Sequence, residues 1–169
     1  MLESKRTILV KYTEDEIGYL EKLLSNPKMV RYIGNGKVRS REQTINFYNW
    51  IIEQYKENEN YGLKIIKDKT TNKNIGHAGL VPQVVEGKEF VEVGYWIEEN
   101  YWGKGYASEI AQTLITYGLQ NLKLPELIAL IQKGNAASEK VALKNGMKKE
   151  KEIMVNGKIV NLYKISLKK

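Results

Sequence analysis

A short glycine-rich turn with the sequence WGKGYA stands where an apolar strand gives way to a helix with an apolar stripe. The first N–H groups of a helix have no partner within it, and the aligned peptide dipoles place about half a positive charge there, so a phosphate group is favoured at this position. Glycine lets a phosphate approach the backbone because it has no Cβ atom. We therefore predict a phosphate-binding turn made of Trp102, Gly103, Lys104, Gly105, Tyr106 and Ala107.

An isolated G-x-G pattern is also compatible with a flexible helix start that binds nothing. The surrounding sequence argues against two other kinds of phosphate-binding loop. A dinucleotide-binding turn would require glycine where Ser108 stands, and a nucleoside-triphosphate loop would require the ending G-K-[ST]. The chain has no cysteine and a single histidine, His77, which excludes thiolate nucleophiles and multi-histidine metal sites. Carboxylates, hydroxyl groups and backbone amides must then perform any chemistry, and we predict no metal.

Two side chains could act as a general base. Glu92 lies in the apolar segment 90–97, where burial would raise the pKa of a carboxyl group toward neutrality. Strand alternation does not say which face Glu92 occupies, so an outward-facing glutamate paired with a lysine is the alternative. His77 titrates near neutrality and is a rival base, although a hydrogen-bonded structural histidine is the more ordinary interpretation.

The elements that must position these residues can be read from capping signals and apolar periodicity. Thr13 with Glu16, and Ser40 with Gln43, form capping boxes that predict helices over 13–24 and 40–58. Strands at 62–67, 74–85 and 90–97 form an antiparallel meander. The remaining pattern predicts a first strand at 8–12, helices at 107–121 and 136–144, a buried parallel strand at 127–131, and a hairpin of 147–155 and 158–167 around Asn156-Gly157.

Length and composition indicate one globular domain over residues 1–169, since a chain of 169 residues can bury roughly 70% of its unfolded surface. The contents of 42% hydrophobic and 28% charged residues argue against disorder. The formal charge is +7 and the pI is 9.3, but lysines are interspersed with acidic residues, so a nucleic-acid partner is not expected. No apolar run has the length of a signal peptide or a membrane span, and we expect a soluble cytoplasmic protein.

The turn and three further motifs resemble the GNAT acetyltransferases over nearly the full chain, and most closely the RimJ/RimL-like branch of ribosomal-protein N-terminal acetyltransferases. The family motif [QR]-x-x-G-x-[GA] coincides with residues 102–107, where Trp102 replaces the first residue, as is common in this branch. The strand VGYWI at 93–97 is similar to the family's fourth strand. The segment NAAS at 135–138 is similar to its second CoA motif, and KNGM at 144–147 stands in the place of its K-x-G-F helix ending.

This resemblance implies a mixed α/β (α+β) fold, in which a mostly antiparallel sheet is splayed at its centre, is flanked by helices on both faces and ends in a β-hairpin. It also implies that acetyl-CoA is the acyl donor and that a primary amine attacks it directly in a ternary complex. Peptide N-termini, polyamines, amino sugars and free amino acids all remain possible acceptors, entering over the equivalents of 31–38 and the final hairpin. The protein could be a monomer or a homodimer.

The resemblance further assigns roles to single residues. Glu92 matches the position of the base in several members, and the Asn135 side chain would hydrogen-bond the cofactor. The backbone amide near Ile97 would polarise the thioester carbonyl. Many members protonate the leaving thiolate with a tyrosine whose place Ala142 takes here, so Ser138, one helical turn after Asn135, is the candidate donor, with a plain capping serine as the alternative. A non-catalytic acyl-CoA sensor is the alternative function.

Overall fold

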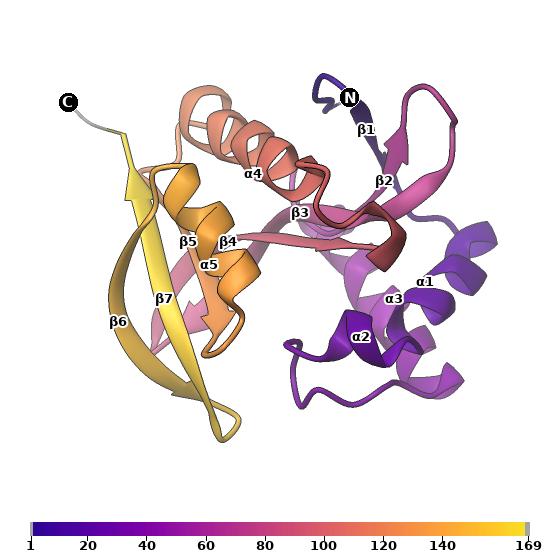
Figure 1. Cartoon of the computed structure of the whole chain (residues 1–169), viewed down its shortest axis with the longest axis horizontal. Helices are drawn as coiled ribbons and strands as arrows, with labels where there is room; N and C mark the ends of the chain where they lie inside the picture. The colour runs from indigo at the N-terminus through magenta and orange to yellow at the C-terminus, as the bar shows by residue number, and fades with distance from the viewer. Residues whose placement is uncertain (1, 168–169) are drawn as a thin grey trace.

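The computed structural model describes residues 2–167, so the predicted domain limits at residues 1 and 169 lie outside the described residues. Seven strands form one sheet in the order β1-β2-β3-β4-β5-β7-β6, and every neighbouring pair is antiparallel except β4–β5 (Figure 1). The predicted mixed fold with a terminal hairpin is confirmed. The strands are β1 (Thr7–Lys11), β2 (Lys64–Asp68), β3 (Asn74–Val85), β4 (Lys88–Ile97), β5 (Glu126–Gln132), β6 (Lys148–Val155) and β7 (Lys158–Ser166).

Five α-helices accompany the sheet. They are α1 (Ile17–Leu24), α2 (Pro27–Val30), α3 (Arg41–Glu57), α4 (Tyr106–Thr116), which continues as a π-helical turn over Tyr117–Asn121, and α5 (Ala136–Lys144). The predicted capping box of α3 is confirmed, with Ser40 and Gln43 bonding each other's backbone N–H. The capping box at Thr13 is wrong, because Glu14–Glu16 forms a separate 3₁₀ turn and the Thr13 side chain makes no cap bond. The short α2, capped by Asn26, was not predicted.

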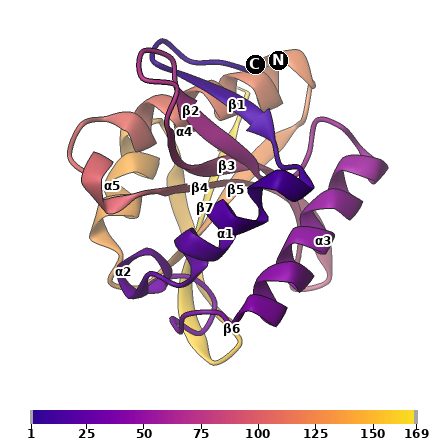
Figure 2. The same ribbon diagram turned by 90° about the vertical axis from the view of Figure 1, so that its right-hand side faces the viewer.

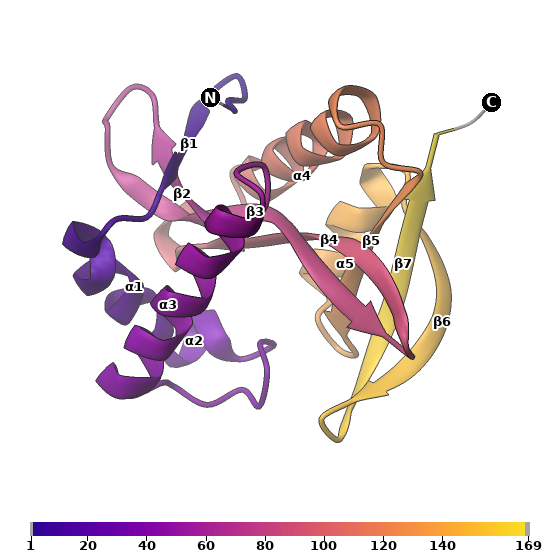
Figure 3. The same ribbon diagram turned by 180° about the vertical axis from the view of Figure 1, so that it is seen from behind.

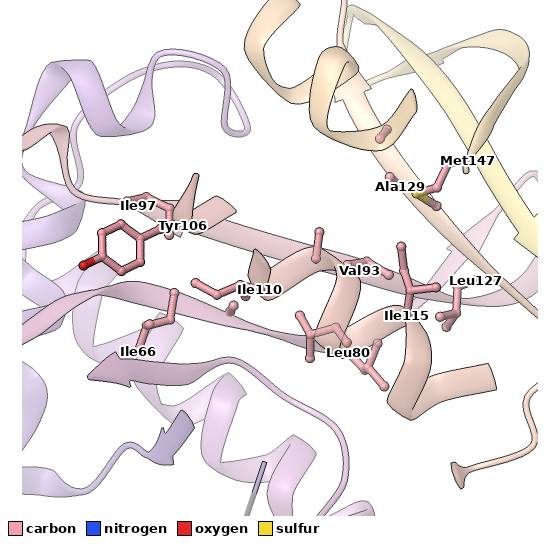
Figure 4. Packing of buried hydrophobic residues seen from close by; sticks show 14 of the residues in the cluster. Ile66, Leu80, Val93, Ile97, Tyr106, Ile110, Ile115, Leu127, Ala129 and Met147 are labelled. Carbon is pink, nitrogen blue, oxygen red and sulfur yellow. The ribbon is translucent and has the colours of Figure 1, made fainter. Parts of the chain in front are cut away.

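The helices cover the sheet from two sides. Helix α4 packs through Ile110 and Leu114 on one face, in the largest core cluster, whose packing Figure 4 shows. Helices α1 and α3 pack through Leu20 and Ile51 on the other face, on the near side of β3 and β4 in Figure 2. Within residues 2–167 no helix is long and apolar enough to span a membrane.

The sheet opens between its two central strands, as the resemblance predicted. β4 and β5 are parallel, and their register contains the single pair Glu92–Ile128. Figure 3 shows β3 and β4 running as a long hairpin from the side of α1 and α3 toward the β6–β7 hairpin. Because strands that separate leave backbone groups unpaired, the splay creates an opening in the middle of the fold.

Candidate active site

A cavity of about 670 Å³ lies at this splay, bounded by β4, the glycine-rich turn, the start of α4, β5 and the start of α5. A larger hollow of about 1260 Å³ between β1, β2 and α4 contains none of the predicted site residues. Lys104 is exposed and is the one predicted site residue outside the smaller cavity. The structure brings the others together along its wall: Glu92, Ile97, Trp102, Gly103, Gly105, Tyr106, Ala107, Asn135 and Ser138.

The turn presents a bare helix start, that is, a helix N-terminus without a side-chain cap, to this cavity. Gly105 is the N-cap residue of α4 and has a φ of 83°, in the left-handed region where a side chain would be strained. No side chain caps the helix, so the N–H groups of its first turn are available to a ligand. A Cβ atom added at Gly103 would meet nothing within 4 Å, which leaves the approach to the turn open. This geometry suits a phosphate or pyrophosphate.

Arg6 holds the glycine-rich turn in place through contacts that the sequence analysis did not predict. Its Nη2 donates to the carbonyl oxygen of Lys104 at 3.0 Å, and its Nε donates to Glu109 of α4 at 2.8 Å. The guanidinium also lies 4.0 Å from the ring centroid of Tyr106, whose hydroxyl donates to Asp68 on β2 at 2.8 Å. The Tyr106 side chain is therefore part of the core, and only its backbone is available to a ligand.

The edge of β4 that faces the splay carries free backbone groups. The N–H of Glu98 donates to the carbonyl of Ile75 on β3, and residues along an antiparallel pair alternate in the side to which they direct these groups. The backbone groups of Tyr95 and Ile97 therefore face away from β3, into the gap. The indole Nε1 of Trp102 donates to the carbonyl of Ile97 at 2.6 Å. An extended ligand with amide groups could pair with the remaining groups.

Glu92 lies on the opposite face of β4 from the α4 core, so the uncertainty about its face is resolved. Val93 packs in the α4 core, while Glu92 borders the cavity. Burial raises the pKa of Glu92 from 4.5 to about 7. Hydrogen bonds donated by Gln83 Nε2, at 2.9 Å, and by the backbone of Leu130 lower the pKa, but their effect is smaller than that of burial. A carboxyl group that is half ionised near neutral pH can accept a proton from a substrate.

Asn135 and Ser138 form a local unit at the start of α5. The Asn135 Oδ1 accepts the N–H of Ser138 at 3.3 Å, and its Nδ2 donates to the Ser138 hydroxyl at 3.0 Å. Since both ends of the amide are engaged, Asn135 acts as a helix cap here. The Ser138 oxygen accepts this bond, so its own hydrogen is left to point at a ligand. Ala142 is buried in the core.

His77 is fully buried, with its Nδ1 2.6 Å from the hydroxyl of Tyr12. Burial, with a smaller effect from the charge of Arg39, lowers the pKa of His77 to about 3. The ring is therefore neutral at physiological pH and is a weak base, which argues against His77 as the general base. Within residues 2–167, no group of three or more His, Cys, Asp or Glu side chains could hold a metal ion.

Comparison with known proteins agrees with this geometry. Residues 6–148 match the family described as an acetyltransferase (GNAT) domain. The uncharacterized N-acetyltransferase YoaA of Bacillus subtilis is 30% identical over 151 residues, which is 89% of this chain and 84% of YoaA. The chain belongs to the GNAT acetyltransferase family and is an acetyltransferase.

Solved structures extend the match to the whole fold. A GNAT acetyltransferase from Bacillus anthracis superimposes with a TM-score of 0.79 at 26% identity, covering 98% of this chain and 97% of that one. RimL, a ribosomal L7/L12 α-N-protein acetyltransferase in complex with coenzyme A, gives a TM-score of 0.79 at 21% identity, covering 97% and 96%. The RimL-like architecture predicted from the sequence is thus present in the fold.

Proposed function

We propose that the chain, as one domain over residues 1–169, transfers the acetyl group of acetyl-CoA to a primary amine, as a monomer or a homodimer. The observation that carries this proposal is that a bare helix start, a splayed strand edge and a carboxyl group with a pKa of about 7 border one cavity. These are the three features that a pyrophosphate, an amide-containing arm and a reacting ammonium group require.

The turn and the strand edge together fit acetyl-CoA. The amides of the turn would hold the pyrophosphate, and the backbone of Tyr95 and Ile97 would pair with the pantetheine arm. The N–H of Ile97 is our candidate for polarising the thioester carbonyl, because a backbone donor fixed by its strand stabilises a developing oxyanion without reorganising. The positive end of α4 adds to the attraction for the phosphates.

Glu92 is our candidate general base. An α-amino group is about one-sixth neutral at pH 7, whereas a lysine amine is neutral about once in several thousand, so a base with a pKa near 7 is better matched to the former. Glu92 would take a proton from the ammonium nitrogen, directly or through one water, before that nitrogen attacks the thioester carbon. Gln83 keeps the carboxyl group oriented by donating to Oε1.

Ser138 is our candidate proton donor for the sulfur that leaves. Its oxygen is held by Asn135, and its side of α5 lines the same cavity as Glu92. A serine hydroxyl is a weak acid, so it would act as a hydrogen-bond donor to the thiolate or relay a proton from water. This assignment rests on position, since Ala142 offers no acidic group.

The test is an assay of CoA release with acetyl-CoA and a panel of primary amines, including peptides with free N-termini, amino acids and polyamines. We expect turnover with at least one α-amine and a fall in kcat by about a hundredfold in the Glu92→Gln variant. Tight binding of acetyl-CoA without turnover of any amine would favour the alternative function, a non-catalytic acyl-CoA sensor.

A further inference from the structure

The segment that precedes α3 is rich in cations and contains no acidic residue between positions 22 and 41. Three of its basic side chains are neutralised: Lys22 pairs with Glu98 at 3.2 Å, Lys28 with Glu99 at 2.7 Å, and Arg41 with Glu21 at 2.7 Å. Arg39 differs from these three. Within residues 2–167 its side chain forms no ion pair with a carboxylate and no hydrogen bond, although it is only partly exposed.

The Arg39 guanidinium is held in place by an aromatic ring. It lies 4.8 Å from the ring centroid of Phe47 on α3, and the backbone N–H of Arg39 donates to the carbonyl of Leu24 at 2.9 Å. Burial lowers the pKa of Arg39, yet a guanidinium stays protonated in proteins. A partly desolvated cation without a counter-ion is costly, and an anionic ligand would remove that cost.

A second unsatisfied donor, on His77, lies on another side chain near Phe47. Burial raises the pKa of Tyr12 well above the usual value, so its hydroxyl keeps its proton. That hydroxyl has no other hydrogen-bond partner within residues 2–167, so we assign it as the donor and Nδ1 of the neutral His77, 2.6 Å away, as the acceptor. The remaining ring hydrogen is then on Nε2, which is buried and has no hydrogen-bond partner among the described residues. The His77 and Phe47 ring centroids are 6.4 Å apart, so both donors belong to the same aromatic cluster.

Trp96 connects this cluster to the cavity, whose lining does not include Arg39, Phe47 or His77 themselves. The ring of Trp96, which lines the cavity, is 4.4 Å from His77 and 6.0 Å from Phe47 between centroids. Trp96 is four residues from Glu92 on β4, and alternation therefore places both side chains on one face. The donors thus lie on the side of the sheet where Glu92 would meet an amine.

We propose that Arg39 and His77 form a carboxylate subsite and that the acceptor carries a carboxylate close to its reacting amine. This inference rests on the proposed function and narrows its substrate. A free amino acid, through its α-carboxylate, and a peptide with an acidic side chain next to its N-terminus both supply this chemistry. Polyamines do not, because they bring further positive charge toward an unneutralised guanidinium.

Matched acceptor pairs that differ only in the carboxylate test the proposal. Amino acids are compared with their amides, and peptides that begin Ser-Asp with peptides that begin Ser-Asn, by kcat/KM for CoA release. We expect the wild-type protein to prefer the carboxylate member of at least one pair by roughly tenfold to a hundredfold, the range for a hydrogen bond to a charged group. Which pair shows the preference distinguishes the two sources.

Two variants complete the design. Arg39→Met should bring the ratio between the paired acceptors close to one, whereas Arg41→Met, the same change two residues away at a surface ion pair, should preserve the wild-type ratio. A wild-type ratio near one, or an Arg39→Met variant that keeps the preference, would overturn the proposal.

A binding measurement separates failure of the subsite from failure of the proposed function. In the presence of CoA, an N-acetylated amino acid should raise the Tm of the wild-type protein more than its amide does, and Arg39→Met should abolish the difference. This outcome supports the subsite even if no amine is turned over. Equal shifts with both ligands would refute it independently of activity.

Discussion

Replacing Glu92 with glutamine removes an ionisable group while keeping its shape and its bonds. Gln83 Nε2 and the backbone of Leu130 both donate to the side-chain oxygens of Glu92, and an amide oxygen can accept the same bonds. General-base catalysis typically contributes about a hundredfold or more, so we expect kcat to fall by about that factor with the Kd for acetyl-CoA nearly unchanged.

The same substitution should have an opposite effect on stability. The difference between a pKa of 4.5 and one of about 7 corresponds to roughly 3 kcal/mol. Because the folded protein holds the Glu92 proton more tightly than the unfolded chain does, stability is full below the unfolded pKa and is lost as the pH rises through the folded pKa. Glutamine avoids this loss. Glu92→Gln should therefore be more stable than wild type by up to roughly 3 kcal/mol at about pH 9, and by much less at about pH 5.

Two assays measure these effects. Urea unfolding at both pH values gives the difference in stability. The pH dependence of kcat, measured with one and the same amine, gives the catalytic profile. Because the amine titrates identically in the assays of both proteins, a difference between wild type and variant comes from the protein. Wild-type kcat should rise through a pKa of about 7, and Glu92→Gln should lack this rise. Glu89→Gln, an exposed glutamate on the same strand, is the control and should change neither quantity. Wild-type pH dependence in Glu92→Gln, or no gain in its stability at alkaline pH, would refute the reasoning.

Three further substitutions test the proton donor and the packing around two glycines. Ser138→Ala should lower kcat by about tenfold or more while leaving the Kd for acetyl-CoA unchanged, and an unaltered kcat would remove Ser138 from the mechanism. Gly79→Ala places a Cβ atom 2.2 Å from the carbonyl oxygen of Gly62, so it should destabilise the protein by about 1–3 kcal/mol in urea unfolding. Gly18→Ala, in helix α1 where a Cβ atom meets nothing within 4 Å, should instead stabilise by about 0.5–1 kcal/mol, and equal effects of the two changes would contradict the packing argument.

Local sequence signals predicted the limits of helices and strands well where turn residues or helix caps mark both ends of the element. The limits of β3 and α5 agree with their predicted ranges, 74–85 and 136–144, because turn residues or helix caps bound both segments. The prediction failed at Thr13, whose capping pattern is outweighed by a 3₁₀ turn. It also missed α2, where Pro27 occupies the first position of a short helix.

The contact between Gln83 and Glu92 could in part have been predicted from the sequence. The turn between β3 and β4 consists of Glu86 and Gly87, both with positive φ, and a two-residue turn fixes the register of the hairpin. That register places Gln83 opposite Phe90 and diagonal to Glu92. The predicted strand 90–97 left out Lys88 and Glu89, which belong to β4, so the register and this contact were missed.

Other features of the site depend on contacts between distant parts of the chain. The bond from Arg6 to Lys104 joins residues 98 positions apart, and no local pattern encodes it. The face of Glu92 is likewise decided by the packing of α4 on the opposite side of β4. Similarly, the sequence identified His77 as titratable, but only burial and its neighbours set its pKa.

Calorimetric titration of acetyl-CoA tests the central claim, that the turn at 102–107 binds the cofactor. Three proteins are compared: wild type, Gly105→Glu, and Gly157→Glu, which carries the same change at a φ of 79° in the β6–β7 turn. We predict that wild type and Gly157→Glu bind acetyl-CoA and that Gly105→Glu does not, since its carboxylate would occupy and repel the pyrophosphate position. No binding to wild type, or equal binding to all three, would contradict the account.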